Sequence, residues 1–120
     1  MKYVVKIPSE RKVEDFQKTG DNVALFRIFD LEGNDVSDQY RHIIFLISGN
    51  AMRGLGKELI RLAHNFEEGK SVSIKPSTKN KVQQEMGMFL MPNSCELTIV
   101  CKDFDPVEKY LDKKSKNCTR

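Results

Sequence analysis

The sequence has no tryptophan, only three cysteines and only two histidines. Cys95, Cys101 and Cys118 form no CxxC pair, and neither histidine stands at a zinc-ligand spacing from them. In one extended strand Cys95 and Cys101 would lie about 20 Å apart, which is beyond the reach of a disulfide. These features exclude a disulfide-stapled secreted scaffold and favour a reducing compartment. We expect no metal site.

Membrane and export signals are also missing. The longest apolar run, at residues 42–48, is far shorter than the roughly 20 residues that a membrane-spanning helix needs. The first eight residues are too short, and too interrupted by Lys6, for a signal peptide. We therefore expect a cytoplasmic protein with no membrane partner.

Neither sign of charge dominates, because 20 Lys and Arg stand against 17 Asp and Glu for a net charge of +3. A nucleic-acid binder usually shows a clustered basic face, so we expect no nucleic-acid partner. Apolar residues at 39% and charged residues at 31% are ordinary for a globular protein. The length suits one domain, which we predict to span residues 1–120.

The stretch at residues 41–66 organises the predicted fold. Residues 42–48 are β-branched and aromatic without alternation, which is typical of a strand covered on both faces. After Gly49 and Asn50, apolar residues recur with helical period, which predicts a central helix over about 51–67. The apolar stripe of that helix consists of Met52, Leu55, Leu59, Leu62, Ala63 and Phe66.

Further strands are predicted at residues 2–7, 22–31 and 71–75, with a hairpin formed by 86–91 and 95–102. Asp105 and Pro106 predict the start of a short C-terminal helix, followed by a frayed tail at 113–120. The fold class is therefore α+β: a mostly antiparallel sheet of about five to six strands, with the central helix packed on one face.

A glycine-rich segment follows the predicted central strand, at residues 49–57 (GNAMRGLGK). A phosphate loop needs a lysine directly after its second glycine and then a serine or threonine, but here Leu55 and Gly56 precede Lys57 and Glu58 follows it. The third glycine of a dinucleotide-binding motif is missing too. We expect no cofactor. Gly54 and Gly56 cost about 1 kcal/mol each in a helix interior, which indicates a close approach of neighbouring backbone.

Candidate catalytic residues are few. His42 and His64 are natural acid–base groups near neutral pH, but neither has a catalytic partner at motif spacing. Cys95 and Cys101 are expected to face the core, where a free cysteine packs like a small hydrophobe. We predict that the protein is not an enzyme; a small enzyme with a histidine acid–base site is the alternative.

Four acidic residues without an intervening base form the most distinctive charged stretch: Asp30, Glu32, Asp35 and Asp38. The stretch lacks the ligand period and the closing glutamate of a calcium loop. It reads either as a solvated turn or as a contact surface for a basic partner.

At residues 54–66 (GLGKELIRLAHNF) and 87–101 (GMFLMPNSCELTIVC), the chain resembles small bacterial immunity proteins. These are the antidotes of polymorphic or contact-dependent growth-inhibition toxin systems. The resemblance implies a small cytoplasmic α+β protein that binds the C-terminal domain of its cognate toxin, often a nuclease, and covers or distorts the active site. Antidotes to basic nucleases are commonly acidic, whereas this chain has a net charge of +3.

The predicted function is therefore an immunity protein that neutralises a toxin domain by protein–protein interaction. A small histidine-based enzyme and a weak nucleic-acid-binding protein are the alternatives. The expected partner-binding residues lie in the acidic stretch and on the polar side of the central helix: Asp30, Glu32, Asp35, Asp38, Arg61 and His64.

Overall fold

The computed structural model describes residues 1–10, 20–78 and 86–111, so the tail expected at 113–120 lies outside the described residues. The chain divides into two compact units. The first contains Met1–Tyr3 and Phe45–Asp103, and the second contains Val4–Ile44 and Phe104–Arg120. Folding of residues 1–120 as a single domain stays a prediction.

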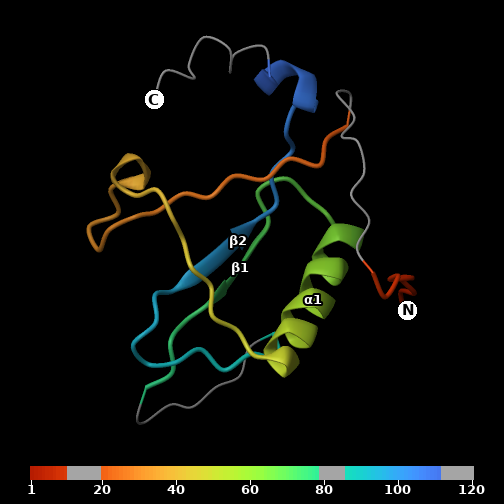
Figure 1. Ribbon diagram of the computed structural model, residues 1–120, viewed down its shortest axis with the longest axis horizontal. Coiled ribbons are helices and arrows are strands. Elements are labelled where there is room, and N and C mark those ends of the chain that lie inside the picture. Colours follow the sequence, from red (N-terminus) through yellow and green to blue (C-terminus); the bar gives the residue numbers. More distant parts are fainter. Residues whose placement is uncertain (11–19, 79–85, 112–120) are drawn as a thin grey trace. The chain divides into compact units, whose positions relative to one another are not determined.

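The long helix of the first unit is α1 (Gly49–His64), and it begins and ends slightly earlier than predicted (Figure 1). Ser48 has extended backbone, and its hydroxyl oxygen accepts a hydrogen bond from the Ala51 N–H at 3.2 Å. Ser48 is thus the N-cap, which satisfies one of the amide groups that a helix start leaves unpaired. At the other end, the Asn65 N–H donates to the Arg61 carbonyl.

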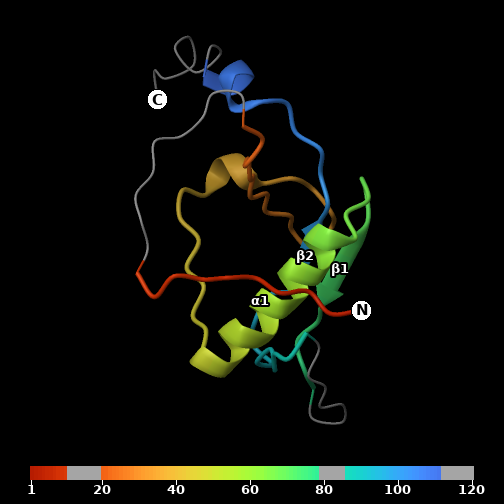
Figure 2. The ribbon, with the colours of Figure 1, turned by 90° about the vertical axis from the view of Figure 1, so that its right-hand side faces the viewer.

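The sheet of the first unit consists of β1 (Ser71–Ile74) and β2 (Leu97–Val100), which pair antiparallel. Ser71 is opposite Val100, and Ile74 is opposite Leu97. Both segments were expected to be strands, but the predicted hairpin is wrong. Strand β2 pairs with β1 rather than with residues 86–91. The helix α1 lies to one side of this pair, as the rotated view also shows (Figures 1 and 2).

The predicted sheet of five to six strands is wrong, since the described residues form a single two-stranded sheet. Residues 2–7, 22–31 and 42–48 are not strands. β-Branched composition favours extended backbone, yet a strand also needs a partner that completes its hydrogen bonds. Of these three segments, only 22–31 contributes an isolated bridge, between Phe29 and Asp35.

The buried core lies in the first unit, which contains all the buried residues of the described part of the chain. Its apolar members come from the helix, from β1 and from the segments on either side of β2: Leu62, Ile74, Met88 and Cys101. Cys101 is buried as predicted, but Cys95 is exposed. Cys95 precedes β2, so the alternation that turns Leu97 and Ile99 inward does not extend to it.

Of the two interior glycines of α1, Gly54 is explained by a close contact with neighbouring backbone. A β-carbon on Gly54 would lie 2.6 Å from the Met86 carbonyl oxygen and 2.8 Å from the Gly87 α-carbon. Real β-carbon atoms do not approach backbone so closely, so only glycine fits here. A β-carbon on Gly56 would meet nothing within 4 Å. The predicted close approach is therefore confirmed at Gly54 and wrong at Gly56.

The second unit contains little regular structure in its described part. A 3-10 turn, η1 (Ser37–Gln39), follows the Phe29–Asp35 bridge. Residues 107–111 are helical, as expected after Asp105 and Pro106. The Val107 N–H donates to the Gly20 carbonyl at 2.9 Å, which ties this helix to the segment at residues 20–28.

No helix in the described ranges combines the length and the apolar character needed to cross a bilayer. Helix α1, the longest, has 16 residues against the roughly 20 that a membrane span requires.

Candidate interaction surfaces

The acidic stretch of the second unit forms a closed, hydrogen-bonded turn at residues 28–37. The Asp30 carboxylate accepts the backbone N–H groups of Asn34 at 2.9 Å and Glu32 at 3.0 Å. The Asp30 N–H donates to the Asn34 carbonyl, and Gly33, at φ 87°, donates back to the Asp30 carbonyl. Glycine suits that left-handed position because it has no β-carbon. The turn is thus built around the Asp30 side chain.

A second aspartate closes the base of the same turn. The Asp35 carboxylate accepts the Ser37 hydroxyl at 2.6 Å and the Ser37 N–H at 3.0 Å. Its other oxygen accepts from the Arg27 guanidinium at 3.1 Å. Ser37 in turn accepts the Ile28 N–H at 2.7 Å. These bonds connect the two arms of the turn.

The hydrogen bonds favour the charged form of both aspartates. The backbone N–H of Asn34, assisted by those of Glu32 and Gly33, lowers the pKa of Asp30 below its usual value. The Ser37 hydroxyl and N–H, followed by the Arg27 guanidinium, lower the pKa of Asp35. Both carboxylates therefore stay ionised at neutral pH while they hold the backbone.

Several apolar side chains in and beside the turn are also exposed to solvent. Leu31, between Asp30 and Glu32, is fully exposed at 102%. Phe29 and Phe26 are exposed at 59% and 74%. Sequence reasoning missed the exposure of these residues, because it assigned them to a strand at 22–31. The turn therefore exposes apolar as well as charged surface, with a solvent-exposed leucine between two acidic residues.

The structure gathers three of the four predicted acidic residues, Asp30, Glu32 and Asp35, into this turn. Asp38 lies next to it in η1, where its carbonyl accepts from the Arg41 guanidinium at 3.3 Å. Glu32 and Asp38 are both exposed. We call residues 28–38, which are the hydrogen-bonded turn together with the adjacent Asp38, the acidic turn.

The other two predicted residues, Arg61 and His64, lie in the last turn of α1, in the first unit. The Arg61 guanidinium is paired with the Glu58 carboxylate. The His64 ring stacks on Tyr3 at 4.0 Å between ring centroids, and its Nδ1 lies 2.9 Å from the Ile60 carbonyl. Both side chains therefore take part in local contacts of the helix end, which is an ordinary role for bases there.

The described residues, 1–10, 20–78 and 86–111, contain no candidate metal site. No three His, Cys, Asp or Glu side chains in these ranges are placed to hold a metal ion. The Asp30 and Asp35 carboxylates are instead bonded to backbone and side-chain donors within or next to the turn.

Comparisons of the chain with family models, with curated proteins and with solved structures found no match.

Proposed function

We propose that this chain works by binding another protein, and that the acidic turn is its contact surface. The supporting observation is the fully exposed Leu31, held between Asp30 and Glu32 on a turn fixed by its own hydrogen bonds. A fixed turn loses little conformational freedom on binding, so more of the contact energy appears as affinity.

The chemistry of the turn defines its partner. Ionised carboxylates favour a basic surface and accelerate the encounter with it. An exposed leucine with neighbouring phenylalanines provides apolar area that a shallow hydrophobic site on the partner would bury. A domain that binds nucleic acid has the basic part of such a surface.

Within this class we propose an immunity protein that binds the C-terminal domain of a cognate toxin in the cytoplasm and blocks it, without catalysis of its own. The resemblance at residues 54–66 and 87–101 supports this choice. A nuclease toxin fits the acidic turn best, because its nucleic-acid-binding surface is basic.

The test is a titration of the chain with the toxin-like domain encoded beside it, measured by calorimetry together with the residual activity of that domain. We expect a stoichiometric complex and loss of activity. Glu32→Lys should weaken binding at least about tenfold, because it places like charges together at the contact. Glu96→Lys, an exposed site in the first unit, is the matched control and should bind like the unchanged chain.

Leucine variants test the apolar part of the proposal. Leu31→Ser should weaken binding about tenfold, as expected for an anchor that loses more than 1 kcal/mol of contact energy. Leu46→Ser removes an equally bare leucine, exposed at 88%, from the first unit and should have no effect. If no neighbouring product binds, or if both members of each pair behave alike, the proposal is wrong.

A further inference from the structure

Helix α1 presents a mixed apolar and basic face on which four large side chains stay exposed. The position of Gly54 against Met86 and Gly87 fixes the rotation of the helix about its axis. The half-buried or buried positions are Ala51, Gly54, Leu55, Gly56, Glu58, Ile60 and Leu62, and all of them except Gly56 and Ile60 lie on one side of the helix. This covered side is rotated away from the apolar stripe that the sequence predicts.

The rotation leaves two large apolar side chains of the predicted stripe in solvent. Met52 is exposed at 55% and Leu59 at 43%, and the two lie seven residues, or about two helical turns, apart on the same side of α1. Gly56 lies between them along the helix, with open space where a β-carbon would stand.

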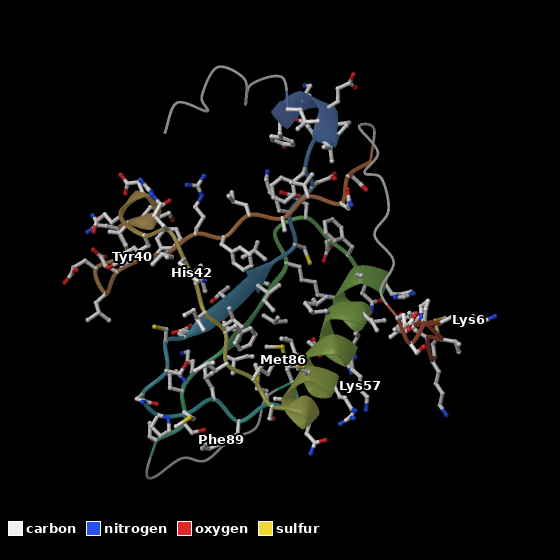
Figure 3. The ribbon with its side chains drawn as sticks, viewed as in Figure 1. Lys6, Tyr40, His42, Lys57, Met86 and Phe89 are labelled. Carbon is white, nitrogen blue, oxygen red and sulfur yellow. The ribbon has the colours of Figure 1, made fainter. Side chains whose placement is uncertain are left out.

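Two bases border this apolar strip. Arg53 and Lys57 are one turn apart and exposed. The Arg53 guanidinium donates to the Asn50 side chain, whereas Lys57 has no ion-pair partner among the described residues. Figure 3 shows Lys57 on the outer side of α1 and Met86 on the side toward the strands. We call Met52, Arg53, Gly56, Lys57 and Leu59 the outer face.

We infer that the outer face binds an acidic amphipathic segment of another protein. Carboxylates on that segment would pair with Arg53 and Lys57, and its apolar side chains would cover Met52 and Leu59. Methionine adapts its shape to different apolar partners, which suits such a surface. The inference concerns the first unit and does not depend on the acidic turn or its proposed function.

Two other anionic partners fit this face less well. Nucleic acid would pair with the two bases but would leave Met52 and Leu59 in water, and it usually needs more basic residues. An anionic membrane would require the apolar side of the helix to insert, yet most of that side is already covered within the first unit.

The experiment uses the full chain and a capped helical peptide of about 14 residues, or 21 Å, built from a Leu-Glu-Glu-Leu-Leu-Glu-Glu repeat. The comparison probes are the same peptide with Lys for Glu, vesicles of phosphatidylcholine with phosphatidylglycerol, and a single-stranded oligonucleotide. Fluorescence anisotropy should show that the acidic peptide binds with a Kd of about 10–500 μM, more weakly in high salt.

Variants locate the site. Lys57→Glu and Met52→Ser should each weaken binding of the acidic peptide at least about fivefold. Lys75→Glu, at an exposed lysine just after β1, should leave the Kd unchanged within about twofold. The Arg53→Glu and Lys57→Glu double variant should prefer the lysine peptide. Equal binding of both peptides by the unchanged chain, binding only to vesicles or oligonucleotide, or equal loss in the Lys75 variant would overturn the inference.

Discussion

Gly54 in α1 lies directly against Gly87, so that a β-carbon on Gly87 would come within 2.9 Å of the Gly54 α-carbon. Gly87 has a φ of 65°, in the left-handed region that glycine adopts without strain. The contact therefore depends on two glycines for different reasons. One must have no side chain because of space, and the other because of space and backbone conformation.

Gly54 and Gly56, the two interior glycines of α1, should respond in opposite ways to substitution by alanine. Gly54→Ala should lower the free energy of unfolding by about 1–3 kcal/mol, because its β-carbon collides with backbone that cannot swing aside. Gly56→Ala should raise it by up to about 1 kcal/mol, because the site is open and alanine favours the helix. Urea unfolding measures both, and a similar loss in the two variants would contradict the contact.

The N-cap of α1 should contribute measurably to stability. Ser48→Ala removes the hydroxyl that accepts the Ala51 N–H and should cost about 1 kcal/mol. Ser48→Asp keeps an acceptor and adds a negative charge at the positive end of the helix dipole, so it should retain the stability. Thermal or urea unfolding of both variants tests this, and an equal loss in the two would argue against capping.

The acidic turn should weaken in acid. The folded-state pKa values of Asp30 and Asp35 lie below the unfolded value, so ionisation stabilises the turn above about pH 3.9. This contribution is lost as the pH falls through the lowered folded-state values. NMR titration of the carboxyl carbons should place both midpoints below the ordinary aspartate value, and ordinary midpoints would contradict the hydrogen-bonded turn.

One substitution separates the two aspartates. Ser37→Ala removes the hydroxyl that is the main cause of the lowered pKa of Asp35, so the midpoint of Asp35 should rise. The midpoint of Asp30 should not move, because its donors are the backbone amides of Glu32, Gly33 and Asn34 and the side-chain amide of Asn34. Asp30 is thus an internal control in the same titration.

The thiols should differ in reactivity. Cys95 is exposed and should react with a maleimide at the rate of an open thiol, whereas Cys101 is 7% exposed and should react on the order of 100-fold more slowly. Peptide mapping by mass spectrometry distinguishes them from Cys118, which lies outside the described residues. Equal labelling in the folded protein would contradict the burial of Cys101.

Local patterns predicted the local elements. The 3.6-residue period of α1 and the alternation of residues 71–75 each depend on one segment, and both were found. The strands expected at 2–7, 22–31 and 42–48 were not, because pairing depends on a partner that lies elsewhere in the chain. The same reason explains why β2 pairs with β1 and not with its nearer neighbour at 86–91.

The candidate surfaces were predictable in charge but not in shape. The acidic residues at 30–38 are evident from the sequence, whereas the exposure of Leu31 follows from the turn that Asp30 and Asp35 build. The rotation of α1 was missed for a related reason. Hydrophobicity placed the covered side at Met52 and Leu59, but the backbone contact at Gly54 turns the helix toward Ala51 and Glu58.

The long connection between β1 and β2 also bears on the order in which the molecule folds. Residues 75–96 must close into a loop before Ile74 can pair with Leu97, and that closure costs chain entropy before any ladder bond forms. Helix α1 needs contacts only between neighbouring turns, so it can form earlier. In a quenched-flow exchange experiment, amides of α1 should gain protection ahead of those of the two strands.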